Sequence, residues 1–119
     1  MGSYKDLKVW QLNQKCVLQA ADLLNALPKD FAYQHVAKQL FRAISSIGAN
    51  IAEGQDSHEG KEFIRYLSIA IRSAIEADHW LCILKNLSKD IGKINCLFDS
   101  NAEVIRMLKG LRKSIEEKR

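Results

Sequence analysis

Residues that end helices or form turns are scarce in this chain, and that scarcity limits its fold more than any other feature. The 119 residues include one proline, Pro28, and six glycines. A β-sheet protein of this length needs a turn about every 8–12 residues, and so few turn-forming residues cannot provide them. The sequence therefore predicts an all-α fold of long helices joined by short connections.

Apolar residues recur at intervals of three and four along four segments, which is the spacing of amphipathic helices. We predict helices near residues 6–27, 30–53, 58–87 and 95–117. Short connections favour antiparallel packing of consecutive helices. Residues 1–119 are thus expected to form one domain, an antiparallel up-down-up-down four-helix bundle.

The residues between these segments indicate where the helices end. Pro28 stops the first helix, and Asp30 is an N-cap for the second. Gly54 is predicted to close the second helix as a left-handed C-cap, and Ser57 to cap the third. A capping-box pattern at Ser100 leaves open a later start for the fourth helix.

The composition is that of a globular protein, with 47% hydrophobic and 27% charged residues. No run of 18 apolar residues is present, so we expect no membrane contact. Three cysteines without metal-site spacing argue against a disulfide framework or a zinc site and favour a cytoplasmic location. The formal net charge of +4 permits contact with nucleic acid but does not require it.

The residue patterns of the common catalytic, metal and cofactor sites are missing from the sequence. The histidines His35, His58 and His79 include no pair at i, i+3 or i, i+4, the spacing that places two metal ligands on one helical face. Glu76 and His79 form one Glu-x-x-His motif, whereas a di-iron bundle needs two. Neither a P-loop nor a G-x-G-x-x-G motif occurs. We therefore expect no enzyme activity and no cofactor.

Polar residues follow helical spacing on the last three predicted helices. Arg42, Ser46, Asn50 and Glu53 share one face of the second helix. We predict that Arg42, Asn50 and Glu53 form a structural network with the first or third helix. The third helix supplies the other candidate members: Arg65, Arg72 and Glu76. The candidates for phosphate contact are Lys61, Arg65, Arg72, Arg106, Lys109, Arg112 and Lys113. Solvated faces with i, i+4 ion pairs are the alternative interpretation.

The third predicted helix carries more apolar residues than one buried stripe needs. A row beyond its main seam consists of Tyr66, Ile69, Trp80 and Ile83. Large exposed apolar patches are uncommon on monomeric proteins, so this row is expected to be buried against another copy of the chain. The alternative is that this helix is the central helix of a compact monomer.

Two sequence blocks resemble the signature segments of a known family. One block reads Tyr4-Lys5-Asp6-Leu7-Lys8-Val9-Trp10-Gln11, and the other reads Ala49-Asn50-Ile51-Ala52-Glu53-Gly54. Both look like the signatures of bacterial four-helix-bundle proteins encoded by intervening sequences within 23S rRNA genes, also labelled ribosomal-protein-like. The chain departs from that pattern at Gly48, where the family usually has proline, and at residues 55–59, where the family's loop is commonly basic.

This resemblance implies architecture more than activity. Family members, and the similar accessory proteins of diversity-generating retroelements, form cyclic pentamers of such bundles. The retroelement proteins also bind nucleic acid and partner a reverse transcriptase. Our leading interpretation is a non-enzymatic homo-oligomer, a pentamer by resemblance, that binds RNA or DNA through pooled basic patches. The alternative is a protein-interaction scaffold or an accessory subunit.

The expected mode of nucleic-acid binding follows from the residue types. Lysine and arginine are plentiful, whereas few aromatic residues are expected at the surface for stacking on bases. Phosphate contacts should therefore dominate, sequence preference should be slight, and affinity should fall as salt rises.

Overall fold

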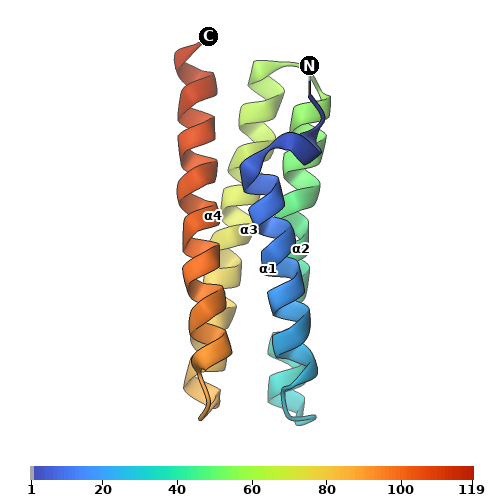
Figure 1. Ribbon diagram of the computed structural model, residues 1–119, viewed down its shortest axis with the longest axis vertical. Coiled ribbons are helices and arrows are strands. Elements are labelled where there is room, and N and C mark those ends of the chain that lie inside the picture. The colour runs from blue at the N-terminus through green and yellow to red at the C-terminus, as the bar shows by residue number, and fades with distance from the viewer. Residues whose placement is uncertain (1) are drawn as a thin grey trace.

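The four amphipathic segments form four long α-helices in the computed structural model, which describes residues 2–119 (Figure 1). Their bounds are α1 Lys8–Asn25, α2 Phe31–Asp56, α3 Gly60–Leu87 and α4 Gly92–Glu117. A short 3₁₀ turn, η1 (Tyr4–Asp6), precedes α1. No strand occurs within residues 2–119, so the predicted all-α fold is confirmed.

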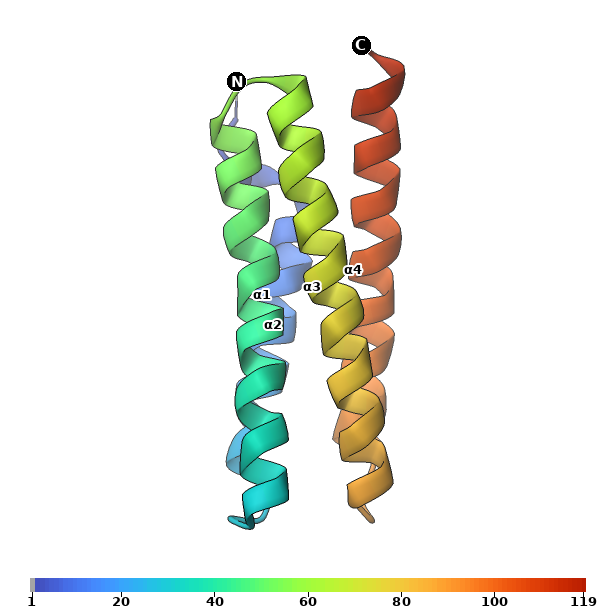
Figure 2. The ribbon, with the colours of Figure 1, turned by 180° about the vertical axis from the view of Figure 1, so that it is seen from behind.

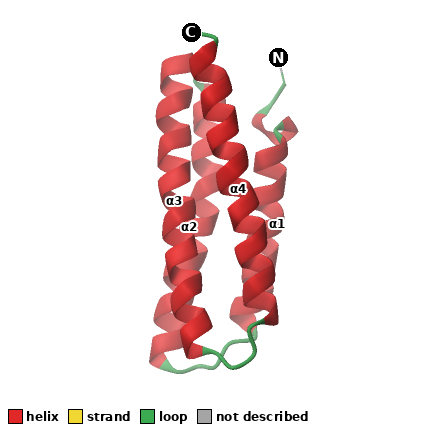
Figure 3. Cartoon of the chain, turned by 90° about the vertical axis from the view of Figure 1, so that its left-hand side faces the viewer, coloured by secondary structure: helices red, strands yellow, loops and turns green. Residues whose placement is uncertain are grey.

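Consecutive helices run antiparallel and form an elongated bundle of 48 × 20 × 20 Å. α2 packs on α3, α3 packs on α4, and α1 closes the bundle by contacting both α2 and α4. The view from behind shows α3 between α2 and α4 (Figure 2). The α2–α3 connection lies at the same end as both termini, and the other two connections lie at the opposite end (Figure 1 and Figure 3). This is the predicted up-down-up-down order.

Large side chains of α2 and small side chains of α3 meet in the core. Four aliphatic residues of α2 are fully buried: Leu40, Ile44, Ile47 and Ile51. The fully buried residues of α3 are three consecutive alanines in the seam, flanked by leucines: Leu67, Ala70, Ala74, Ala77, Leu81 and Leu84. Large residues of one helix fill the space left by small residues of the other, so α3 can pack closely against its neighbours.

The end of α2 differs from the prediction at Gly54. The helix continues through Gly54 to Asp56, and Gly54 is buried and has no positive φ. A Cβ atom added to Gly54 would lie 2.8 Å from side-chain atoms of both Phe63 and Tyr66. The left-handed residue is instead His58, with a φ of 61°. The predicted C-cap was therefore wrong: the close approach of α3 to α2 requires glycine at this position.

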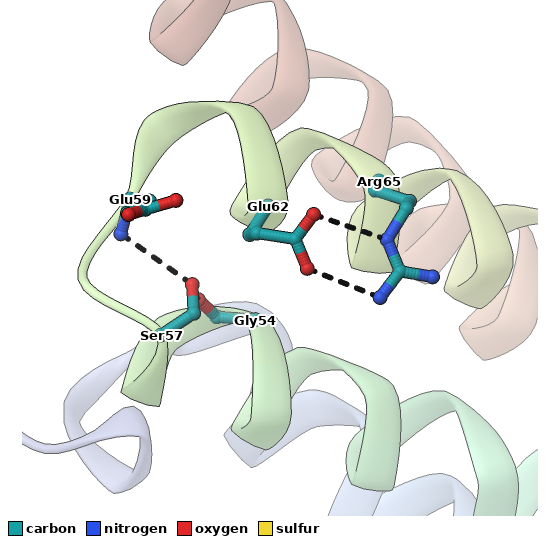
Figure 4. A network of polar contacts seen from close by, with 5 residues as sticks. All are labelled: Gly54, Ser57, Glu59, Glu62 and Arg65. Atoms are coloured by element: carbon teal, nitrogen blue, oxygen red, sulfur yellow. Dashed lines mark hydrogen bonds and ion pairs between the residues drawn. The ribbon is translucent and has the colours of Figure 1, made fainter.

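The predicted capping roles of two polar residues also differ from the structure. Ser57 ends α2 and does not cap α3, which begins at Gly60 after Glu59. Its Oγ donates to the Gly54 carbonyl at 2.7 Å and accepts a long hydrogen bond from the Glu59 N–H at 3.5 Å (Figure 4). Asp30 precedes α2 as predicted but makes no capping hydrogen bond with its side chain.

The fourth helix begins earlier than predicted. α4 starts at Gly92, before the expected start near Asn95 and well before Ser100. The Asp90 carboxylate accepts a hydrogen bond from the Gly92 N–H at 3.2 Å, which satisfies one of the free donors at this helix start. The first helix, by contrast, is two residues shorter at each end than the predicted 6–27.

Two buried asparagines tie neighbouring helices together. Asn13 of α1 donates from Nδ2 to the Ile44 carbonyl of α2 at 3.2 Å, and Asn101 of α4 donates to the Ala74 carbonyl of α3 at 2.8 Å. A backbone carbonyl has two lone pairs, so each can accept this bond in addition to its helical one. A buried polar contact of this kind is satisfied at one relative position of two helices, so it fixes their axial register.

The contact between α1 and α2 is close at Gly48, where α2 continues without a break. A Cβ atom added to Gly48 would lie 2.7 Å from Asn13 Oδ1 and 3.5 Å from Trp10 Nε1. The absence of a side chain therefore makes room for the buried asparagine.

We predict that Gly48→Ala lowers the free energy of unfolding by about 1–3 kcal/mol, because Asn13 must move and weaken its bond to α2. Gly110→Ala is the matched control, since no atom lies within 4 Å of a Cβ added at this exposed position of α4. The control should stabilise the protein by about 1 kcal/mol through helix propensity. Denaturant unfolding measures both values, and equal stabilisation by both variants would contradict the close packing at Gly48.

Candidate functional site

The packing of α4 on α3 brings two basic clusters, distant in the sequence, to one side of the bundle. Arg112 of α4 donates from Nη1 to Ser68 Oγ of α3 at 3.2 Å, which aligns the end of α4 with the beginning of α3. Helical spacing places further exposed cations on both helices around this contact. We call this set the basic face: Lys61, Arg72, Arg106, Lys109, Arg112 and Lys113.

Arg65, the remaining candidate for phosphate contact, lies on the same side of α3 as Lys61 and Arg72 but is not counted in the basic face, because its charge is paired. Its guanidinium donates to the Glu62 carboxylate through two hydrogen bonds of 3.1 and 3.3 Å (Figure 4). The hydrogen bond from Arg65 lowers the pKa of the Glu62 carboxyl. The guanidinium also lies 4.5 Å from the centre of the Tyr66 ring, and Tyr66 contacts Gly54 of α2. Both partners of the guanidinium belong to α3 itself, so the charge of Arg65 is less available to an external anion than that of Lys61 or Arg72.

The cations of the basic face differ in how far their charge is already neutralised. Arg106 forms an ion pair with Glu103, and Arg112 Nε lies 3.8 Å from Glu116 Oε1. Four cations form no ion pair with any carboxylate of residues 2–119: Lys61, Arg72, Lys109 and Lys113. These four keep their charge available for an external anion.

The polar network predicted on α2 forms only in part. Ser46 Oγ of α2 lies 2.8 Å from Ser73 Oγ of α3, and Asn50 Nδ2 donates to the Ser46 carbonyl at 2.8 Å. Arg42 and Glu53 are exposed, and neither makes an ion pair within the described chain. The contact across the two helices therefore depends on Ser46, which the sequence places on this face, and on Ser73, which sequence analysis missed because only the register of α2 against α3 reveals it.

Of the partners expected for that network, Glu76 lines a hollow between α2 and α3 together with Arg42 and Asn50. Arg65 is paired with Glu62, and the Glu76 carboxylate accepts a hydrogen bond from Trp80 Nε1 at 3.0 Å. Arg72 is exposed on the outer side of α3. Neither Arg65 nor Arg72 makes an ion pair with a side chain of α2 within residues 2–119. Exposed charges are well solvated, so a cross-helix ion pair gains too little to order two long side chains.

The apolar row predicted to contact another copy is partly covered by the chain itself. Trp80 and Ile83 pack against the core of the bundle. Tyr66 is half-buried against Gly54, and Ile69 lines a hollow between α2 and α3. α2 thus covers one edge of the row, which leaves less free apolar surface than the sequence predicted.

The most exposed apolar side chains of the bundle's long faces lie outside that row. Leu18 of α1 is 71% exposed, and Ile75 of α3 is 52% exposed. Phe41 of α2 is 37% exposed and lines a groove between α1 and α2 with Ala21 and Leu24. Free apolar surface is therefore found on two different sides of the molecule.

Few aromatic side chains are exposed, but one of them belongs to a row of rings. Phe31, the first residue of α2, is 85% exposed. It begins a row of rings that crosses from α2 to α3 through His35, Trp80 and His79. Within residues 2–119, Phe31 and Phe41 are the exposed members of the Phe, Tyr and Trp residues, so the expectation of few exposed aromatic side chains is met. The row itself was not predicted, because it combines residues from two helices.

The histidine, cysteine and carboxylate side chains of residues 2–119 are dispersed over the bundle. No group of three or more His, Cys, Asp or Glu residues within residues 2–119 is arranged to hold a metal ion. Burial raises the pKa of the Cys16 thiol to about 11, so little of the reactive thiolate is present at neutral pH. Cys82 and Cys96 are exposed. No helix in the part of the chain that the structure describes is long and apolar enough to cross a membrane.

The two sequence blocks that carry the family resemblance meet at one end of the bundle. The rings of Tyr4 and Trp10 are in edge contact with their centres 5.2 Å apart, and Trp10 lies beside Gly48. Tyr4, Ala52 and Glu53 line a hollow of about 380 Å³ between η1 and the end of α2. The two blocks therefore build the contact between the chain's N-terminal segment and α2.

Comparisons with known proteins agree with this architecture. The family described as 23S rRNA-intervening sequence protein matches residues 5–110. A crystal structure from Bacteroides thetaiotaomicron VPI-5482, described as a protein of unknown function from the S23 ribosomal protein family, is similar with a TM-score of 0.79 and 25% sequence identity. The similarity covers 88% of this chain and 98% of that chain. None of the curated proteins compared with this chain matches it.

The polar contacts between α2 and α3 predict unequal effects of two substitutions. Ser46→Ala should lower the free energy of unfolding by about 0.5–1.5 kcal/mol, because it removes the hydrogen bond to Ser73. Glu53→Ala should change it by less than about 0.5 kcal/mol, because Glu53 is exposed and unpaired within residues 2–119. Denaturant unfolding compares the two, and a larger loss from Glu53→Ala would show that Glu53 has a partner outside its own chain.

Proposed function

This chain belongs to the 23S rRNA-intervening sequence protein family, and on that premise we propose that it is a non-enzymatic, self-associating bundle that binds RNA or DNA. The observation that carries the proposal is the basic face, where α3 and α4 gather cations around the contact between Arg112 and Ser68. Lysine and arginine side chains attract phosphate groups of any sequence. Binding is therefore directed at the nucleic-acid backbone.

Self-association would strengthen this binding. One chain carries a net charge of +4, so five copies, the number that the family resemblance implies, would carry five times +4, about +20. Several basic faces on one particle can engage one polyanion at the same time. The second contact is then intramolecular, and the overall affinity exceeds that of a single chain.

The distribution of apolar surface supports a head-to-tail assembly. Leu18 and Phe41 are exposed on the α1–α2 side, whereas Ile75 is exposed on α3. A contact that joins one patch to a different patch on the next copy repeats around an axis and closes into a ring when the rotation allows it.

A protein-interaction role is the second candidate, and the groove lined by Ala21, Leu24 and Phe41 favours it. The resemblance to accessory proteins of diversity-generating retroelements makes a reverse transcriptase the expected partner in this case. This candidate differs from the first in one measurable way, because the purified protein alone would not bind nucleic acid.

We predict that the double variant Lys109→Glu/Lys113→Glu loses at least about tenfold in affinity for a structured RNA. Both lysines are exposed and unpaired within residues 2–119, so the reversal should leave the fold intact. The slope of log affinity against log salt should become shallower by about 2 if each lysine contacts one phosphate. Fluorescence anisotropy over a range of salt concentrations measures both quantities.

The matched control is Lys15→Glu/Lys29→Glu, which changes the net charge by the same amount at exposed positions on α1 and the α1–α2 connection. Affinity should fall much less in the control. Equal losses in both variants would show that net charge, and not the basic face, governs binding. Absence of binding by the unmodified protein would favour the protein-interaction candidate.

Light scattering tests self-association. We expect a mass well above the 13.5 kDa of one chain, with five copies as the favoured number. The variant Leu18→Asp/Phe41→Asp should shift the mass toward that of one chain, because it places charges in an apolar contact while far-ultraviolet circular dichroism stays helical. The unmodified protein measured at 13.5 kDa would contradict self-association.

A further inference from the structure

The row of rings on α2 and α3 has a defined geometry, and we call these four residues the aromatic row: Phe31, His35, Trp80 and His79. The Phe31 and His35 rings are stacked, with centres 6.1 Å apart and 19° between their planes. Trp80 meets His35 edge-on at 6.1 Å and His79 at 5.0 Å. The row is continuous across the two helices.

The aromatic row is held firmly at Trp80 and is free toward solvent elsewhere. The Trp80 indole packs against the core, and its N–H donates to Glu76 at 3.0 Å. His35 and His79 are exposed, and Phe31 is 85% exposed. A phenylalanine exposed to this extent contributes little to folding, whereas rings mounted on helices are already positioned for an external planar group.

Cations flank the aromatic row on both helices. On α2, Lys38 and Arg42 follow His35 by three and seven residues, so they lie on the same face of the helix. On α3, Arg72 of the basic face lies two helical turns from His79, about 10 Å along the axis. Lys38, Arg42 and Arg72 are exposed and form no ion pair within residues 2–119. The surroundings of the rings are therefore suited to a polyanion.

We propose that the aromatic row is a base-stacking platform for a single-stranded segment of RNA or DNA. The proposal rests on the proposed function and adds the class of nucleic acid. Planar bases stack on tryptophan, histidine and phenylalanine rings in single strands, whereas a duplex keeps its bases stacked inside the helix. Phosphates on either side of the stacked bases reach Lys38, Arg42 and Arg72.

Charge distinguishes this occupant from a second copy of the chain. Another copy also carries a net charge of +4 and would bring like charge toward the three flanking cations. A single-stranded nucleic acid supplies both the rings that stack and the negative charges that pair. The basic face, by comparison, needs only phosphates and accepts duplexes equally well.

The test compares three probes: single-stranded oligodeoxyadenylate of about 12 nucleotides, its duplex with oligothymidylate, and heparin. The variant Phe31→Ala/His35→Ala removes two exposed rings, and Gln19→Ala is the control because it removes an exposed uncharged side chain from α1, which contributes to neither the basic face nor the aromatic row. We expect the ring variant to lose about 5–150-fold in affinity for the single strand. Its affinity for the duplex and for heparin should stay within about twofold, as should all affinities of the control.

The fluorescence of Trp80 tests base stacking without any substitution in the aromatic row. In a Trp10→Phe background, Trp80 is the remaining tryptophan of the chain. Stacking of a base on the row should quench its fluorescence when the single strand binds, and heparin bound at the same occupancy should not. This readout stays informative even if a ring substitution disturbs the fold.

The outcomes separate this inference from the proposed function. If the ring variant binds the single strand as tightly as the unmodified protein, while Lys109→Glu/Lys113→Glu loses binding, base stacking is overturned and the proposed function stands. A change in the oligomer's mass in the ring variant, without selective loss of single-strand affinity, also overturns stacking and assigns the row to self-association. If the unmodified protein binds none of the probes, both proposals fail together.

Discussion

The axial register of α3 against its two neighbours determines where the candidate functional side chains lie. α4 is tied to α3 at two levels, by the bond from Asn101 to the Ala74 carbonyl and by the bond from Arg112 to Ser68. α2 is tied to the opposite side of α3 by the serine contact at Ser73. Small residues in the buried seam of α3 allow these contacts to form, because they bring the helices close enough for short side chains to reach across.

A slip of this register would disperse both candidate surfaces. Each residue along an α-helix turns the side chain by about 100°, and each turn advances it by about 5.4 Å. The basic face combines Lys61 and Arg72 of α3 with the cations of α4, and the aromatic row combines Trp80 with His35 of α2. Neither surface belongs to one helix. Both exist because the buried contacts permit one relative placement of the helices.

Local sequence patterns predicted the features that depend on one segment at a time. Apolar periodicity placed the four helices, since burial of one stripe is a property of each helix alone. The predicted C-cap at Gly54 was wrong because glycine occurs both in left-handed caps and in close helix contacts. The sequence of α2 alone does not distinguish the two, whereas the positions of Phe63 and Tyr66 on α3 do. The serine contact and the aromatic row were missed for the same reason: their members come from different helices.

The candidate surfaces contain features that folding alone does not favour. Lys109 and Lys113 stand four residues apart on α4, where like charges destabilise a helix by about 0.2–0.5 kcal/mol. Phe31 leaves most of its ring in water and gains little from burial. The repulsion between the two lysines and the exposed phenylalanine ring make the free energy of folding slightly less favourable. Both lie on surfaces where bound phosphates and bases would offset this loss. Along the outer side of α3, Lys61 and Arg72 lead from the basic face toward His79, so one bound strand could neutralise the cations and cover the rings together.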